Sequence, residues 1–403
     1  MIIMKLRTPE SFWLLKNGIL HGYPSLNENS TCDIAVLGAG ITGALISHAL
    51  LRAGYDTVVI DRRDVGTGSS SATTSMLQYE IDTPLTQLAE MIGEEGAVTC
   101  YRAGIESIRE LHALVKKEQV DCGFELKQSL QVSHSKKGIA SLMEEYLLRK
   151  KHGFHVEWLS REDILQRYQM ESHPGVLSAE GASLDAFQFA HRLLYRNHQR
   201  GLRIYDHTDI RKIDYHGPVV IETDGGYRLT CKRVIFCTGF ETVKMFRKKI
   251  ADIVTTFALV SEQEINLYDQ LKDTLIWDTG DPYIYMRTTD DRRLLLGGED
   301  VPHKYNGFTD KLKNRKADAL IAKVRQLFPT IRFTEDYNWA GAFGVTKDGL
   351  PYIGEHPDYP NAIFVLGFGG NGITFSVQGM KLVLKLLARE QNDPLLTHYR
   401  FNR

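Results

Sequence analysis

The chain has no excess of charge of either sign and no long apolar run. Its 403 residues include 49 Lys and Arg against 50 Asp and Glu, a formal net charge of −1. This balance provides no overall field that would attract nucleic acid or an anionic membrane, so we expect neither partner. No uncharged apolar stretch approaches the roughly 20 residues that a transmembrane helix needs, so we expect no membrane span.

Cysteine is also scarce, and the first residues lack the features of a secretion signal. The five cysteines are scattered without any Cys-x-x-Cys pair, which argues against a disulfide framework and a thiolate metal site. Residues 1–23 are interrupted by Lys, Arg and Glu and contain no continuous apolar core. We therefore expect reduced, mostly buried thiols, no metal site and a cytoplasmic location.

The most informative motif lies between residues 34 and 61. An apolar run at 34–37 leads into Gly38-x-Gly40-x-x-Gly43, a helical pattern follows, and a second apolar run ends at Asp61. This order predicts a dinucleotide site, with Gly38 for the tight turn, Gly40 for approach of a pyrophosphate and Gly43 for close helix packing. Asp61 is placed to accept hydrogen bonds from ribose hydroxyls.

The residues next to these positions refine the prediction. Ile41 and Thr42 open the helix, whose N-terminus offers N–H groups and partial positive charge to the phosphates. An acid at position 61 favours an unphosphorylated ribose, hence FAD or NAD over NADP, although Arg62 and Arg63 weaken that choice.

A segment rich in Gly, Ser and Thr follows at 65–75. It has two interpretations, a flexible linker or a loop folded over the cofactor, and its position directly after Asp61 favours the loop. The cofactor ligands expected from this loop are Ser70, Ser71, Thr73 and Thr74. We expect Gln78, Tyr79 and Glu80, which come next, to reach the reactive ring.

Two later stretches repeat the pattern of a buried strand followed by glycine. The first runs through 233–237 to Thr238 and Gly239, as in a parallel strand with a ligand at its carboxyl end. The second, at 363–376, adds a glycine-rich turn and a helix start. The predicted ligands there are Gly369, Gly370, Asn371, Gly372, Ile373 and Thr374. A second anion-stabilising helix start fits a flavin, whose N1–C2=O edge gains negative charge on reduction, and so favours FAD over NAD.

The wide separation of these motifs predicts a discontinuous domain in an α/β chain. We expect a Rossmann-like FAD-binding domain at 31–84, 175–245 and 335–403. An α+β substrate domain built on an antiparallel sheet is expected at 85–174 and 246–334, where 253–298 has the pattern of several strands. Residues 1–30 are expected to form an arm that packs onto the body through the aromatic cluster at 12–15.

Within the expected substrate domain, a period of two places Tyr283, Tyr285 and Arg287 on one face of a strand. Two phenols and a guanidinium could clamp a carboxylate or another polar group of a substrate. The alternative is an aromatic sheet face with an Arg in solvent. We carry these three residues as catalytic-site candidates.

Together the motifs resemble the D-amino-acid oxidase-like FAD-dependent oxidoreductases, the group with glycine oxidase, monomeric sarcosine oxidase and gamma-glutamylputrescine oxidase. The likeness rests on Gly38-x-Gly40-x-x-Gly43 with Asp61, residues 68–74, Cys237-Thr238-Gly239, Thr346-x-Asp348-Gly349-x-Pro351 and residues 369–372. It implies hydride transfer to flavin N5 from a carbon bearing nitrogen, in a small amine, N-substituted amine or amino acid. The resulting imine is hydrolysed, and electrons pass to oxygen or to a carrier.

Two departures from the family pattern bear on the substrate and the flavin. Amino-acid oxidases of the group have an Arg two residues after Trp-x-Gly to hold a carboxylate, whereas this chain has Phe343. Members with tethered flavin carry a Cys near the position of Gly341, so non-covalent FAD is expected here. The rival interpretations are an FAD-dependent 2-hydroxy-acid dehydrogenase, a flavin-bearing subunit that needs a partner, and an NAD-dependent dehydrogenase.

Overall fold

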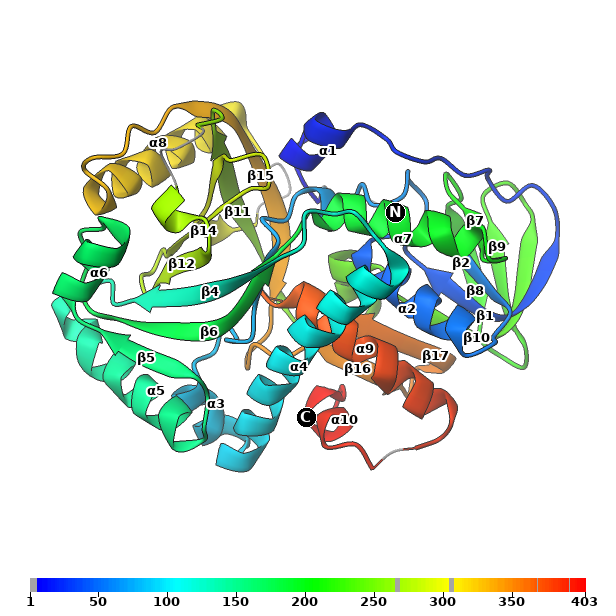
Figure 1. The fold of residues 1–403 in the computed structure, drawn as a ribbon. Coiled ribbons are helices and arrows are strands. Elements are labelled where there is room, and N and C mark those ends of the chain that lie inside the picture. Colours follow the sequence, from blue (N-terminus) through cyan, green and yellow to red (C-terminus); the bar gives the residue numbers. More distant parts are fainter. Residues whose placement is uncertain (1–5, 265–268, 304–307, 368, 391) are drawn as a thin grey trace.

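Two β-sheets flanked by helices organise the computed structural model of the chain (Figure 1). The structure describes residues 6–264, 269–303, 308–367, 369–390 and 392–403. Phe368, inside the predicted glycine-rich turn, lies outside these residues. No helix in these described ranges combines the length and apolarity that a membrane crossing requires.

The first sheet carries the dinucleotide motif. Its main strands run in the order β16 (Tyr352–His356), β17 (Tyr359–Leu366), β10 (Arg228–Phe236), β1 (Ser30–Leu37), β2 (Thr57–Ile60) and β7 (Arg203–Tyr205). All neighbours pair in parallel except β16 with β17. A hairpin of β8 (Ile210–Asp214) and β9 (Val219–Thr223) joins the start of β10. The centre of the sheet is apolar because parallel strands are covered on both faces.

Helices on one side of this sheet form its largest apolar core (Figure 1). They are α2 (Ile41–Arg52), α7 (Ala186–His198), α9 (Gly372–Leu387) and α4 (Glu94–Glu118). The strand–turn–helix units predicted around Gly38 and before residue 373 are therefore confirmed, as β1 followed by α2 and β17 followed by α9.

The second sheet is mostly antiparallel, as expected for the substrate domain. Its order is β15 (Glu335–Val345), β11 (Asp252–Ser261), β14 (Leu294–Pro302), β13 (Ile284–Thr288), β12 (Thr274–Asp278), β4 (Glu125–Val132), β6 (Gly175–Ser183) and β3 (Met76–Gln78), with β5 (Val156–Leu159) beside β6. Among the described strands of this sheet, only β12 and β4 pair in parallel. Four helices lie near this sheet: α3 (Leu85–Ile92), α5 (Ile139–Lys151), α6 (Arg161–Tyr168) and α8 (Asp310–Leu327) (Figure 1).

Three strands of the second sheet differ from the expected domain boundaries. β3, β6 and β15 lie in ranges expected to belong to the FAD-binding domain, yet they pair with substrate-domain strands. The reason is physical: a local apolar pattern predicts that a segment is a strand, whereas its sheet depends on cross-strand partners far away in the chain.

The N-terminal arm packs onto the body through its aromatic residues. Helix α1 (Phe12–Asn17) buries Trp13 completely. The Trp13 Nε1–H donates to the carbonyl of Thr73 at 2.6 Å, and Phe12 stacks with Trp339 at a centroid distance of 6.0 Å. The arm therefore ties the Ser- and Thr-rich loop to the second sheet.

Candidate functional site

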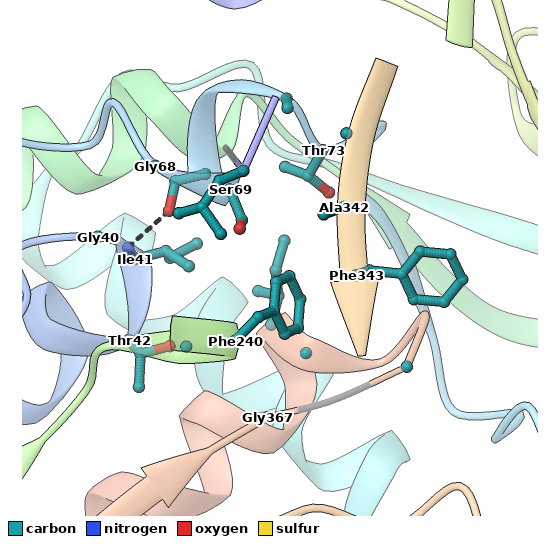
Figure 2. A pocket seen from close by; sticks show the side chains of 18 of the residues that line it. Gly40, Ile41, Thr42, Gly68, Ser69, Thr73, Phe240, Ala342, Phe343 and Gly367 are labelled. Atoms are coloured by element: carbon teal, nitrogen blue, oxygen red, sulfur yellow. Dashed lines mark hydrogen bonds between the residues drawn. The ribbon is translucent and has the colours of Figure 1, made fainter. Parts of the chain in front are cut away.

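A cavity of about 850 Å³ lies where the two sheets meet, within the size range of small-molecule and cofactor sites. Figure 2 shows Gly40, Ile41 and Thr42 on one side and Ala342 and Phe343 of β15 on the other. The predicted cofactor residues that line it are Gly38, Gly40, Ile41, Thr42, Asp61, Arg62, Ser70, Thr73, Thr74, Thr238, Gly239, Gly341, Gly369, Gly370, Gly372 and Ile373.

Glycine is required at the turn into α2 because backbone atoms approach it closely. A Cβ on Gly38, whose φ is +100°, would lie 2.5 Å from the carbonyl oxygen of Cys237. A Cβ on Gly43 would lie 1.8 Å from the carbonyl oxygen of Gly38. Gly43 does not line the cavity; it packs the helix against the turn, as its predicted role requires.

The start of α2 suits an anionic group. Its N-cap residue Gly40 offers no capping side chain, and the positive end of the helix faces the cavity. The Ile41 N–H donates to Ser70 Oγ at 2.9 Å, which brings the Ser- and Thr-rich loop to the same place (Figure 2). The loop interpretation of residues 65–75 therefore describes the structure, and the linker interpretation does not.

Three predicted ligands support the cavity without lining it, which corrects the expectation of direct contact. Ser71 Oγ donates to the carbonyl of Gly68 at 2.9 Å, and Thr374 Oγ1 donates to the carbonyl of Asn371 at 2.9 Å. Asn371 Nδ2 donates to the carbonyl of Gln78, the last residue of β3, at 3.0 Å and to that of Glu80 at 2.8 Å. Short polar side chains at turns readily bond to nearby backbone, and a motif does not reveal which way they turn.

Asp61 occupies the end of β2 as predicted. The N–H groups of Ala39 and Arg63 donate to its two carboxylate oxygens at 2.7 and 2.9 Å. Burial raises the pKa of Asp61, and these N–H donors oppose the rise. Arg62 and Arg63 both pair with Glu241, whose single carboxylate offsets part of the positive charge that would otherwise suit a 2′-phosphate.

These features fit a bound FAD. The uncapped start of α2 and the glycine turn suit the pyrophosphate, and Asp61 suits the ribose. A second helix start, α9, meets the same cavity through Gly372 and Ile373, where partial positive charge would stabilise a reduced flavin. Cys237 is the only cysteine among the described lining residues, and all five cysteines are buried and free.

The second sheet supplies the opposite end of the cavity. Tyr283 and Tyr285 line it with ring centroids 5.6 Å apart, in agreement with their expected position. A Cβ on Gly297 of β14 would lie 2.3 Å from the Tyr285 hydroxyl, so glycine there makes room for the ring. Trp277 of β12 and Phe343 of β15 also line this end.

Arg287 does not share that position, and the expectation of a carboxylate clamp is wrong for this residue. It is 2% exposed and does not line the cavity. Its guanidinium donates to the carbonyls of Thr74, Leu184 and Thr288 at 2.7, 2.9 and 3.1 Å. Alternate residues share a face but each step of two moves roughly 7 Å along the strand, which takes Arg287 past the cavity. The solvent-exposed alternative is also wrong.

Two carboxylates that the sequence did not single out line the substrate end. Asp82, after β3, accepts a hydrogen bond from the Gly370 N–H at 2.8 Å. Asp300, on β14, has its pKa raised to about 6 by burial, while Thr256 and Tyr283 oppose the rise. Neither residue belongs to a motif, and only their convergence from distant segments reveals them.

Of the expected trio at 78–80, two residues line the cavity. Gln78 and Glu80 do so, whereas Tyr79 turns away and is 1% exposed with its hydroxyl 3.0 Å from Ser178 Oγ. Glu80 is buried, and its Oε1 accepts from Ser178 Oγ at 2.8 Å and lies 3.5 Å from Arg149 Nη1.

The cavity is electrostatically divided. The Lys and Arg side chains among its described lining residues are Arg62, Arg63, Arg211 and Lys212. They belong to the end of β2 and to β8, in the first sheet. The substrate end therefore combines carboxylates and aromatic rings with no lining cation in the described chain.

One cluster of potential metal ligands occurs in the described residues, outside the cavity. Asp64, Asp206 and His207 place one ligand atom each within 4.8 Å of one another. His207 Nε2 pairs with Asp64 Oδ1 at 3.0 Å, and Asp206 Oδ2 accepts from the Tyr23 N–H at 2.8 Å. Each of these three residues therefore already interacts with another group of the protein.

Comparison with known proteins agrees with this site. The family model of FAD dependent oxidoreductases, DAO, matches residues 33–383. Gamma-glutamylputrescine oxidoreductase of Escherichia coli (strain K12) is 24% identical over 94% of this chain and 90% of its own. Putative Rieske 2Fe-2S iron-sulfur protein YhfW of Bacillus subtilis (strain 168) is 23% identical over 98% of this chain and 76% of its own.

A solved structure shows the same fold. Glycine oxidase of Geobacillus kaustophilus is 24% identical over 89% of this chain and 93% of its own sequence. Its crystal structure superposes with a TM-score of 0.79 and covers 93% of this chain and 99% of that one. With the family model matching most of its length, this chain belongs to the DAO family of FAD-dependent oxidoreductases.

Proposed function

We propose that the protein oxidises the C–N bond of a small amine or N-substituted amine, with FAD held non-covalently. When bound, FAD supplies the hydride acceptor for the carbon that bears nitrogen. Residues 38–42 and Asp61 would hold the dinucleotide, and residues 369–373 the flavin end. Water hydrolyses the resulting imine.

The substrate end of the cavity carries this proposal. Asp82 and Asp300 line it, and Phe343 stands where amino-acid oxidases of the family hold a carboxylate with Arg. The anionic group of a 2-hydroxy acid or an α-amino acid would meet like charge and an apolar ring there, which disfavours it. An amine lacks this anionic group and meets no such repulsion there.

The side chains at this end orient the substrate and exclude water. Tyr283 and Tyr285, whose ring centroids lie 5.6 Å apart, form an aromatic part of the cavity wall. Oxidation requires the reacting nitrogen to arrive neutral, so correct placement of the C–H bond contributes more than a strong base. This fits a cavity whose described lining contains no histidine.

The test is an absorption spectrum of the purified protein followed by anaerobic titration. We expect a two-band flavin spectrum, release of the flavin on acid precipitation, and bleaching by members of an amine panel but not by 2-hydroxy acids. A colourless protein that stays colourless after reconstitution overturns FAD binding. Bleaching by 2-hydroxy acids alone overturns the amine assignment and supports the dehydrogenase.

A flavin-bearing subunit that passes electrons to a partner is the second candidate. It is favoured by the similarity to a relative named as a Rieske 2Fe-2S protein, of which this chain covers 76%. Stopped-flow reoxidation of the reduced protein distinguishes the acceptors: rapid reaction with oxygen supports an oxidase, and slow reaction with oxygen but rapid reaction with ferricyanide supports a carrier. The cytoplasmic location stays a prediction.

A further inference from the structure

Asp300 is a carboxylate without a cationic partner at the wall of the cavity. Its neighbours include Thr256 and Tyr283, which oppose the rise in its pKa, and both Asp300 Oδ1 and Thr256 Oγ1 are buried without a hydrogen-bond partner. The nearby Lys316 forms its ion pair with Glu299 at 2.8 Å. Within the described residues, no Lys or Arg forms a salt bridge with Asp300. An incompletely satisfied carboxylate in a ligand cavity is a strong acceptor for a charged donor.

Asp82 lines the same cavity. It follows β3 and is held by the Gly370 N–H at 2.8 Å, whereas Asp300 belongs to the second sheet's β14. The charge of Asp82 raises the pKa of Asp300, so the two carboxylates act on each other. A cation between them would relieve this repulsion.

Aromatic rings complete the surroundings. Tyr283 and Tyr285 stand beside the carboxylates, and Trp277 lines the same end. The faces of such rings attract ammonium groups, more strongly where water is excluded. Carboxylates and rings together therefore describe a pocket for an alkylammonium group.

The chemistry of the reaction decides which nitrogen occupies this pocket. A nitrogen whose neighbouring carbon is oxidised must be neutral, whereas a carboxylate stabilises the protonated form. The nitrogen bound by the carboxylates is then a different one from the nitrogen that reacts.

We propose that Asp300, assisted by Asp82 and Tyr283, binds a second, positively charged nitrogen, so that the substrate class is a diamine or an N-substituted diamine. This inference rests on the proposed amine oxidation. Asp300 is a specificity-determining residue in this account, and the reacting carbon is placed by the rest of the cavity.

The pocket responds to pH through groups that surround Asp300. The charged or titratable groups facing it are Asp82 from the segment after β3, Tyr283 just before β13, Tyr285 on β13, and Lys316 from α8. The pKa of Asp300 is about 6 because burial disfavours its charged form. It is therefore ionised at pH 8 and largely neutral at pH 5, where ammonium binding should weaken.

The experiment titrates the FAD-loaded enzyme with 1,4-diaminobutane and with butylamine, which differ by the second nitrogen, and follows the flavin absorption. In the wild type at pH 8 we expect the diamine to bind about tenfold tighter, the scale of a charge-assisted contact. Asp300→Asn should remove this preference and leave butylamine affinity within about twofold. At pH 5 the wild type should lose the preference as well.

The matched control is Glu299→Gln, which removes the same charge one residue earlier on β14. Glu299 pairs with Lys316 and Lys323 and does not line the cavity, so its variant should keep the preference. Equal binding of the two amines by the wild type at pH 8, or equal weakening of both by Asp300→Asn, overturns the inference. If Asp300→Asn fails to fold, the pH series of the wild type decides.

Anaerobic bleaching in the same titrations separates this inference from the proposed reaction. Bleaching without an Asp300-dependent diamine preference overturns the pocket and leaves amine oxidation standing. An Asp300-dependent preference in an enzyme that no amine bleaches supports the pocket and overturns the reaction.

Discussion

At the scale of single residues, the shape and charge of the cavity depend on a few positions with small or uncharged residues. A larger or charged side chain at these positions would change which ligands the cavity can hold. Gly38 and Gly43 keep the turn into α2 closed, with potential Cβ contacts of 2.5 and 1.8 Å to backbone oxygens. Gly297 admits the Tyr285 ring. Phe343 contributes an apolar ring to the lining of the cavity.

Gly43→Ala should disrupt the dinucleotide site. The new Cβ would overlap the carbonyl oxygen of Gly38, a backbone atom that cannot rotate away, so α2 must shift. We expect a loss of about 3 kcal/mol in the free energy of unfolding and a weakened FAD affinity, measured by urea denaturation and flavin fluorescence. Gly22→Ala, where nothing lies within 4 Å, is the control. Wild-type FAD affinity in Gly43→Ala would contradict this packing role.

Phe343→Arg should change which substrates are accepted. A guanidinium at this position of β15 would hold a carboxylate through paired hydrogen bonds and would offset the charges of Asp82 and Asp300. We expect the ratio of kcat/KM for α-amino acids to that for amines to rise about tenfold. Phe343→Leu controls for loss of the ring. The idea fails if both variants leave the ratio unchanged.

At the scale of elements, the Ser- and Thr-rich loop is held by parts of the chain outside its own domain. Trp13 of α1 donates to the carbonyl of Thr73, and Arg287 of β13 donates to that of Thr74. The Arg287 guanidinium also lies over the Trp13 ring, 5.4 Å from its centroid. The arm and the second sheet thereby position a loop that lines the cofactor cavity.

Trp13→Ala should therefore affect both stability and FAD binding. Deleting a fully buried indole costs about 3–5 kcal/mol, and the carbonyl of Thr73 loses its donor. We expect a lower Tm for the apoprotein and a larger Kd for FAD. Leu15→Ala in the same helix, at a residue 54% exposed, should change neither. An unaltered Kd for FAD in Trp13→Ala would show that α1 acts on stability alone.

At the scale of the whole molecule, residues of both sheets line the cofactor cavity. Bound FAD should therefore stabilise the two sheets together. A ligand that binds only the folded state stabilises it by an amount that grows with the logarithm of the ligand concentration above its Kd. Stability also depends on titratable groups buried in the core of the first sheet. His191 of α7 is such a group, fully buried with its ring 4.4 Å from that of Phe187.

Burial lowers the pKa of His191 from 6.5 to about 4. The unfolded chain then binds this proton more readily than the folded chain. The contribution of His191 to the free energy of unfolding should therefore be fully present above pH 6.5 and be lost as the pH drops toward 4. The loss from this residue is about 3 kcal/mol across that interval. Urea denaturation of the FAD-loaded protein at pH 7.5 and 4.5 measures it, and His191→Asn should reduce the difference. A pH dependence identical to the wild type's would exclude this role.

Local sequence patterns were sufficient to predict much of the cofactor site but little of the substrate end of the cavity. The Gly38 turn, Asp61 and the helix start at Gly372 were predictable because strand, turn and helix signals occupy adjacent positions. Ser71, Asn371 and Thr374 were placed in the correct loops, but they bond to backbone rather than face the cavity. Side-chain direction in a turn depends on neighbours that the motif does not contain.

The amino-acid sequence by itself determined that this chain binds a dinucleotide and belongs among flavin-dependent oxidoreductases, because turn geometry and helix polarity are properties of short segments. Only the tertiary structure decided that β3, β6 and β15 join the second sheet, that Arg287 supports a loop, and that Asp82 and Asp300 converge. Those outcomes depend on contacts between segments far apart in the chain, and no local period encodes such contacts.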